Sequence, residues 1–152
     1  MSDYPLPQVT ELTKPYWDAL DQGHLAFLRC RTCQHAWLPA REECPNCLKR
    51  NMLWEKASGS AKILSWVVYH SAYHDAFKDR LPYVVAIVEL DEGPRLITNF
   101  IGPREALRGD LPVSLVIERE QGFALARFSI VDSPLCKWDS SLGLGALAGP
   151  KA

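Results

Sequence analysis

The feature that most constrains the fold is a pair of C-x-x-C motifs, Cys30-Arg31-Thr32-Cys33 and Cys44-Pro45-Asn46-Cys47, separated by ten residues. Each motif brings two sulfur atoms to one side of a turn, and two facing turns supply the four ligands of a tetrahedral metal site. Such a site has no open position for a substrate, so it suits structure rather than catalysis. The motifs predict a zinc ribbon with one structural zinc ion, bound by Cys30, Cys33, Cys44 and Cys47.

Three other interpretations of the motifs are a redox dithiol, a pair of disulfides, and iron in the same sulfur cage. A redox C-x-x-C motif usually occurs singly and opens a helix after a strand, and neither motif has that context. Disulfides are disfavoured in a reducing compartment. Spacing does not separate zinc from iron, because both metals accept tetrahedral sulfur.

The composition is that of an ordinary globular protein of 152 residues, with 47% hydrophobic and 23% charged residues and a net charge of -1. This near-neutral balance gives no overall attraction to nucleic acid or anionic lipid. No apolar run approaches the roughly 18 residues that cross a bilayer, and residues 1–5 lack the features of a signal peptide. We therefore expect a cytoplasmic protein, where thiols stay free for metals.

A short helix is predicted before the ribbon, where Thr13 can cap, Pro15 can begin and Gly23 can end it. Tyr16 and Trp17 share one side of this helix, and such a stripe usually packs on the rest of the fold. Exposed Tyr and Trp are also favoured interface anchors. Tyr16, Trp17 and the later Trp138 are therefore our candidates for docking a partner protein.

After the ribbon, the chain has the composition of strands, rich in branched and aromatic residues. The expected strands are residues 61–69, 83–90, 95–101, 113–120 and 123–128. Turn signals at 91–94 and 121–122 predict two hairpins, and residues 102–109 could form one helical turn. Five strands with an insertion between the third and fourth match an OB-fold barrel, and a five-stranded sandwich is the alternative.

The predicted fold is therefore mainly β, divided into four parts. Residues 1–25 form an N-terminal helical segment, 26–56 the zinc ribbon, 57–132 the OB-fold and 133–152 a glycine-rich flexible tail.

Candidate ligand-binding side chains gather around the segment after the first barrel strand, because loops of an OB barrel carry its ligand contacts. The alternative is an ordinary solvated loop. We find no nucleophile with an adjacent base and no paired carboxylates, so no catalytic residue is predicted. The ligand-binding candidates are Tyr69, His70, Tyr73, His74, Arg80 and Tyr83.

Several features occur here in a familiar order. They are the helix with its Tyr16-Trp17 pair, the two cysteine motifs, and the strand segments 82–86 and 89–96. From about residue 16 to 132 the chain resembles a family of two-domain proteins in which a rubredoxin-like zinc ribbon precedes an OB-fold. The resemblance implies an accessory protein of acyl-CoA metabolism without catalytic residues. It also implies that the protein binds or shields acyl-CoA and docks a thiolase, a thiolase-like aldolase or a hydratase.

The sequence departs from similar ribbons at Gln34 and Leu48, because glycine often follows each second cysteine. Glycine adopts a positive φ without strain, so we expect both turns to be slightly strained here.

The charge pattern leaves two kinds of ligand to weigh. The ribbon is locally basic, and this bias could meet the phosphates of CoA, although scattered surface charge is commoner. Single-stranded nucleic acid is the alternative ligand, because zinc ribbons and OB-folds both occur in proteins that stack bases. A pI of about 6.4 argues against it. The ribbon's basic residues are Arg29, Arg31, Arg41, Lys49 and Arg50.

Overall fold

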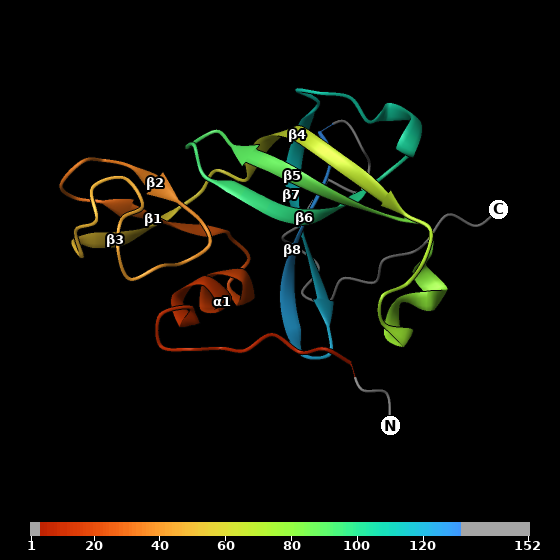
Figure 1. The fold of residues 1–152 in the computed structure, drawn as a ribbon, viewed down its shortest axis with the longest axis horizontal. Coiled ribbons are helices and arrows are strands. Elements are labelled where there is room, and N and C mark those ends of the chain that lie inside the picture. Colours follow the sequence, from red (N-terminus) through yellow and green to blue (C-terminus); the bar gives the residue numbers. More distant parts are fainter. Residues whose placement is uncertain (1–3, 132–152) are drawn as a thin grey trace.

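The computed structural model describes residues 4–131, which form a small three-stranded sheet, a five-stranded closed barrel and one α-helix (Figure 1). This architecture confirms the predicted mainly β fold with an N-terminal helix, a zinc ribbon and an OB-fold barrel. The elements are α1 (Lys14–Asp21), β1 (Ala26–Cys30), β2 (Ala36–Trp37), β3 (Met52–Lys56), β4 (Ser60–Tyr69), η1 (Asp75–Arg80), β5 (Tyr83–Leu90), β6 (Arg95–Ile101), η2 (Arg104–Ala106), β7 (Pro112–Glu120) and β8 (Phe123–Ile130).

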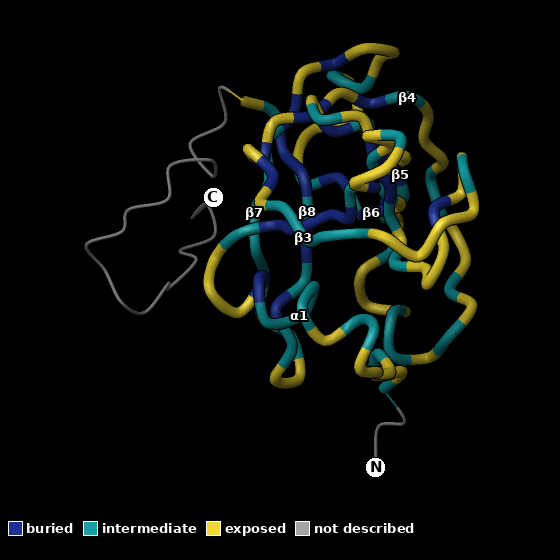
Figure 2. Tube along the Cα trace, turned by 90° about the vertical axis from the view of Figure 1, so that its left-hand side faces the viewer, coloured by how far each residue is buried: buried dark blue, intermediate teal, exposed yellow. Residues whose placement is uncertain are grey.

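The barrel strands follow the order β4-β5-β6-β8-β7, and β4 pairs with β7 to close the ring. All pairs are antiparallel except β6 with β8, which meet through Phe100 opposite Phe128 and Ile101 opposite Ser129. Strand β4 pairs with β5 along nearly its whole length, with a register shift between Ile63 and Ser65, and pairs with β7 only through residues 60–62. Buried residues alternate with more exposed ones along β5 and β8, and the buried positions are dark blue on the barrel strands in Figure 2.

Strand β1 has one buried side facing the barrel and the other facing the ribbon. Phe27 belongs to the barrel core together with Leu20 of α1 and Leu25, whereas Leu28 and Cys30 belong to the ribbon core. This alternation follows from the two-residue period of a strand. It makes β1 the structural link between the ribbon and the barrel.

Local details differ from the sequence expectations at the ends of elements and in loops. The helix is shorter than the predicted span 13–23, and the turn expected within 102–109 is the 3-10 helix η2. The 3-10 helix η1 was not predicted; the His74 side chain caps it by accepting a hydrogen bond from the Ala76 N–H at 3.1 Å. The predicted tail 133–152 lies outside the described residues. Within residues 4–131, no helix is long and apolar enough to cross a membrane.

Candidate metal centre and binding surface

The four cysteines of the C-x-x-C motifs converge on one point in the ribbon. Their Sγ atoms all lie within 4.8 Å of one another, and the Cys30–Cys47 and Cys33–Cys44 pairs are each 3.6 Å apart. A tetrahedral ion with Zn–S bonds of about 2.3 Å places its sulfurs about 3.8 Å apart, so the donor set fits zinc. In the described part of the chain, these cysteines are the only group of three or more His, Cys, Asp or Glu side chains gathered to hold a metal.

Both cysteine turns use a left-handed residue directly after their second cysteine. Gln34 has φ 64° and Leu48 has φ 62°, as expected from the positions where similar ribbons carry glycine. The Gln34 N–H donates to the Cys30 carbonyl at 3.0 Å, and the Leu48 N–H donates to the Cys44 carbonyl at 2.9 Å. This conformation costs a non-glycine residue about 1 kcal/mol. The two turns are therefore equivalent in backbone and equally strained.

Hydrogen bonds around the sulfurs favour ionised thiols. The Asn46 side chain and the His35 backbone N–H lower the pKa of Cys33 to about 6. At Cys47 the Lys49 N–H acts in the same direction, but burial and the neighbouring sulfurs outweigh it and raise the pKa to about 12. Four ionised cysteine sulfurs this close together repel one another, so not all four thiols ionise readily without a metal. A bound dication would offset that repulsion.

Most of the predicted ligand-binding residues meet in an aromatic cluster at the end of the barrel opposite the ribbon (Figure 1). Tyr69 ends β4 and Tyr83 begins β5, and their rings stack with centroids 5.2 Å apart. Tyr73 meets the edge of Tyr69 at 5.5 Å and is 87% exposed. We define the aromatic cluster as Tyr4, Tyr69, Tyr73, His74, Phe77 and Tyr83.

The remaining ligand-binding candidates are Arg80, His74 and His70, of which only His74 belongs to the aromatic cluster. The Arg80 guanidinium lies 5.7 Å from the Phe77 ring centroid and forms an ion pair with Glu120 at 2.6 Å. His74 both caps η1 and lies 6.1 Å from the Phe77 ring. His70 is exposed, and among the described residues no ring contact or side-chain hydrogen bond joins it to the aromatic cluster.

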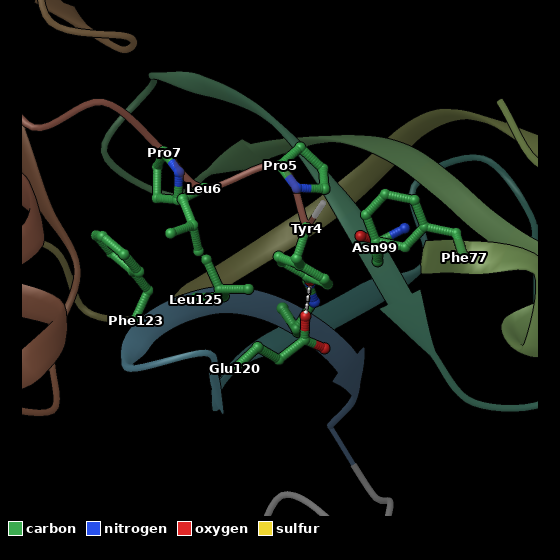
Figure 3. A pocket seen from close by; sticks show the side chains of 10 residues that line it. Tyr4, Pro5, Leu6, Pro7, Phe77, Asn99, Glu120, Phe123 and Leu125 are labelled. Atoms are coloured by element: carbon green, nitrogen blue, oxygen red, sulfur yellow. Dashed lines mark hydrogen bonds and ion pairs between the residues drawn. The ribbon is translucent and has the colours of Figure 1, made fainter. Parts of the chain in front are cut away.

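Residues 4–7, the N-terminal arm, lie across the barrel and line one side of an open pocket of about 300 Å³ (Figure 3). The Tyr4 hydroxyl donates a hydrogen bond to Glu120, and Leu6 lies over Leu125 and Phe123 in the close view. Sequence reasoning missed Tyr4, because no local pattern connects it with a carboxylate 116 positions away.

Glu120 is the polar centre of this pocket. Its side chain is only 15% exposed and receives hydrogen bonds from Tyr4 and Arg80. Burial acts to raise its pKa, but these hydrogen bonds and the charges of Arg80 and Arg127 outweigh burial and hold the pKa below its ordinary value.

Exposed aliphatic side chains also lie along the outer face of the barrel. Ile87 of β5 lies opposite Ile97 of β6, and they are 37% and 72% exposed. Val67 of β4, opposite Val85, is 53% exposed. Together these residues form an apolar outer face, on the strands that carry the ligand surface in OB-folds.

The ribbon is less basic in space than in sequence. Arg29 pairs with Glu55 at 2.8 Å, and Arg50 pairs with Glu43 at 2.9 Å and with Glu42 at 3.7 Å. The ribbon and the aromatic cluster lie at opposite ends of the molecule, so the predicted phosphate-binding and aromatic residues do not form one site (Figure 1).

The predicted docking residues of α1 are largely engaged inside the chain. Trp17 meets Phe123 of β8 edge to face at 5.7 Å, and Tyr16 meets Trp17 at 5.2 Å. Burial raises the pKa of Tyr16 to about 12. Packing therefore explains both side chains, and their docking role stays a prediction; Trp138 lies outside the described residues.

Two family models cover the ribbon and most of the barrel. Residues 17–52 match the model described as the rubredoxin-like zinc ribbon domain of ChsH2, and residues 54–118 match its C-terminal OB-fold domain. The fold also matches the solved structure titled Ltp2-ChsH2(DUF35) aldolase with a TM-score of 0.73 and 31% identity, covering 82% of this chain and 98% of that chain. The chain belongs to the DUF35 family.

Curated relatives of this DUF35 protein carry two kinds of name. A probable enoyl-CoA hydratase alpha subunit from Thermomonospora curvata is 36% identical over 98 residues, which are 64% of this chain and 30% of that protein. A DUF35 domain-containing scaffold protein from Methanocaldococcus jannaschii is 41% identical over 78 residues, 51% of this chain and 55% of the relative. The match thus spans less than two thirds of either relative's length.

Proposed function

We propose that this DUF35 protein is a non-catalytic accessory subunit that docks a thiolase-like, aldolase or hydratase enzyme and helps to present its acyl-CoA substrate. The aromatic cluster carries the ligand part of this proposal. Tyr73 is 87% exposed beside the stacked Tyr69 and Tyr83, so it contributes little to the core and offers an aromatic face to a ligand. Adenine rings and acyl chains both bind such faces.

The metal centre has a structural role in this proposal. One zinc ion per chain, held by Cys30, Cys33, Cys44 and Cys47, would use all four sulfurs and stabilise the ribbon. The thiolates need a reducing environment, in keeping with a cytoplasmic location.

The apolar outer face supports the docking part of the proposal. Val67, Ile87 and Ile97 expose aliphatic surface that a partner enzyme would remove from water. The ribbon's cations lie far from the aromatic cluster in Figure 1. We therefore expect the partner enzyme, rather than the ribbon, to bind the phosphates of CoA.

Nucleic-acid binding has weaker support. The cations next to the aromatic cluster are neutralised, since Lys78 pairs with Asp75 at 2.8 Å and Arg80 pairs with Glu120 at 2.6 Å. A surface that stacks bases normally combines its aromatic rings with a positive groove.

A titration that compares the two ligands tests this proposal. Acetyl-CoA added to the full chain, alone and mixed with a candidate thiolase-like subunit, should give a saturable binding signal in isothermal titration calorimetry, whereas a single-stranded oligothymidylate should not. Binding of the oligonucleotide that weakens steeply with salt, with no response to acetyl-CoA, would favour the nucleic-acid function instead.

A further inference from the structure

The N-terminal arm, residues 4–7, is attached to the barrel by few contacts. It has no regular secondary structure, and no backbone hydrogen bond joins it to any other part of residues 4–131. Pro5 is exposed, and 55% of Leu6 is exposed although its side chain lies over Leu125 in Figure 3. A segment with so few buried contacts can leave its position at a low cost in free energy.

Tyr4 supplies the polar attachment of the arm. Its hydroxyl donates a hydrogen bond to Glu120, and its ring meets the Phe77 ring edge to face at a centroid distance of 5.6 Å. Glu120 also pairs with Arg80 at 2.6 Å and with Arg127 at 3.9 Å, so it keeps charged partners when Tyr4 leaves. The released hydroxyl can bind water, so neither group is left buried without a partner.

The barrel surface below the arm is mainly apolar and is held in place without the arm. Phe123 and Leu125 of β8 line the open pocket there, together with Phe77 of η1. Phe123 packs against Trp17 of α1 with ring centroids 5.7 Å apart, and Leu125 is fixed opposite Glu118 by the pairing of β8 with β7. The pocket of about 300 Å³ is at the lower end of the size range of ligand sites, and it would become a longer groove if the arm moved away.

The contacts in this pocket indicate the chemistry of a ligand that could replace the arm. The arm is itself a peptide segment, yet it makes no backbone hydrogen bond to the pocket residues. The pocket therefore contacts apolar groups rather than a peptide backbone. Its neighbouring cations are already neutralised, because Arg80 pairs with Glu120 and Arg127 pairs with Glu118 at 3.5 Å. An uncharged apolar chain fits these surroundings best.

Phe77 connects the pocket with the aromatic cluster. Its ring lines the pocket and lies 6.4 Å from the ring of Tyr83, which stacks on Tyr69. Tyr4 contacts Phe77 and also lines the pocket, so it occupies the junction of the two surfaces. A ligand that extends from the aromatic cluster onto β8 must therefore displace Tyr4.

We propose that the N-terminal arm covers a groove for the acyl chain and is displaced when a chain longer than acetyl binds. This inference rests on the proposed accessory function, and it adds a position for the acyl chain and a dependence on chain length. The hydrogen bond between Tyr4 and Glu120 breaks, the arm moves off β8, and the chain contacts Phe123 and Leu125 in place of Leu6. An acetyl group carries only one methyl group, so it gains little from the groove.

Isothermal titration calorimetry with octanoyl-CoA and acetyl-CoA tests this inference on the full chain, alone and with the candidate thiolase-like subunit. Tyr4→Phe keeps the ring but removes the hydrogen bond that holds the arm, so the affinity for octanoyl-CoA should rise by about tenfold relative to that for acetyl-CoA. A chain that lacks residues 1–7 should show at least the same rise. Gln8→Ala, an exposed change next to the arm, should leave both affinities unchanged.

A change in the floor of the groove should have the opposite effect. Leu125→Asn makes this surface polar and should lower the affinity for octanoyl-CoA by about tenfold relative to that for acetyl-CoA. Zinc content and cooperative thermal unfolding establish that each variant is folded. If Leu125→Asn does not fold, Tyr4→Phe and the shortened chain decide the question.

The outcomes separate this inference from the function on which it rests. If the wild type binds both esters and neither Tyr4→Phe nor the shortened chain changes the ratio of affinities, the inference is wrong and the accessory function stands. If the shortened chain binds a peptide of residues 1–10 but the ratio is unchanged, the groove is a peptide site and the inference is also wrong. If no protein binds either ester, alone or with the subunit, the ligand part of the proposed function fails and the inference fails with it.

Discussion

Glu120 connects three segments that lie far apart in the sequence. Tyr4 of the N-terminal arm and Arg80 of η1 both donate hydrogen bonds to this carboxylate, which ends β7. The side chain is mostly buried, so losing a partner leaves a polar group with little access to water. Glu120 thereby holds the arm and η1 against the outside of the barrel.

The lowered pKa of Glu120 predicts a specific acid sensitivity. A carboxylate with a lowered pKa in the folded state contributes stability above its unfolded pKa of about 4.3, and this stability is lost as the pH falls through the folded value. Wild-type protein should therefore lose more stability than Glu120→Gln when thermal unfolding is compared between neutral pH and about pH 3. Glu105→Gln, which changes an exposed carboxylate of η2, is the control. Equal losses in all three proteins would contradict the role of Glu120.

For individual residues, the sequence predicted backbone conformation better than it predicted contacts between distant parts of the chain. The positions of Gln34 and Leu48 were assigned a positive φ, because a cysteine turn imposes that geometry locally. The contact between Tyr4 and Glu120 could not be predicted, since it depends on how the finished barrel places β7 beside the arm.

Among the elements, the ribbon depends most on a ligand. Its strands are short, and its core cluster is built around the cysteines with Leu28 and Trp37. A module of this size buries too little apolar surface to fold without help.

Cys44→Ser tests the dependence of the ribbon on metal. One lost thiolate opens the tetrahedral site, so zinc content should fall from about one per chain to near zero. Hydrogen exchange should show that β1 to β3 lose protection while the barrel strands keep theirs. A variant that keeps both its zinc and a protected ribbon would contradict the assigned role. Ser58→Ala, a change at an exposed residue outside the metal centre, is the control.

Strand β1 couples the ribbon to the barrel through Phe27, which is 1% exposed within the barrel core. Phe27→Ala should lower the free energy of unfolding by about 3–5 kcal/mol through the cavity that it leaves. Calorimetry should show the loss in the barrel transition, while zinc content stays near one per chain. Val67→Ala, at an exposed position, should change stability by only about 0.5 kcal/mol. A Phe27→Ala protein as stable as the control would refute the coupling.

The sequence predicted those helices and strands whose pattern of apolar residues extends over several residues. The five barrel strands were predicted within two residues of their observed ends, because branched and aromatic residues mark both of their faces. The helix η1 was missed, since its six residues have no buried side and depend on the cap from His74. Four of the ligand-binding candidates lie together in the aromatic cluster, and their role in binding a ligand stays a prediction.

In the whole molecule, the distance between the aromatic cluster and the metal centre limits what a single ligand can contact. The aromatic cluster lies at one end of the molecule and the metal centre at the other, with the apolar outer face on barrel strands β4 to β6 (Figure 1). One small ligand is therefore not expected to contact both ends, whereas a protein partner is large enough to do so.

The aromatic cluster predicts how acyl-CoA affinity should respond to mutation. Tyr69→Ala combined with Tyr73→Ala removes two ring faces and should weaken acetyl-CoA binding by roughly tenfold, since an aromatic contact contributes about 0.5–1.5 kcal/mol beyond its buried area. Isothermal titration on the isolated chain and on the complex would measure this change. Glu105→Gln, an exposed change in η2 outside the aromatic cluster, should bind like the wild type. Equal affinity in all variants would remove the cluster from the binding site.

We propose that this DUF35 protein assists an acyl-CoA enzyme without catalysing a reaction itself. The most direct measurement compares acyl-CoA turnover by the partner enzyme alone, by this chain alone and by the purified complex of the two. We predict a stable complex with a higher kcat/KM than the partner alone, and no turnover by the chain alone. Turnover by the isolated chain, or a partner whose kcat/KM is unchanged by a chain that does not bind it, would contradict the account.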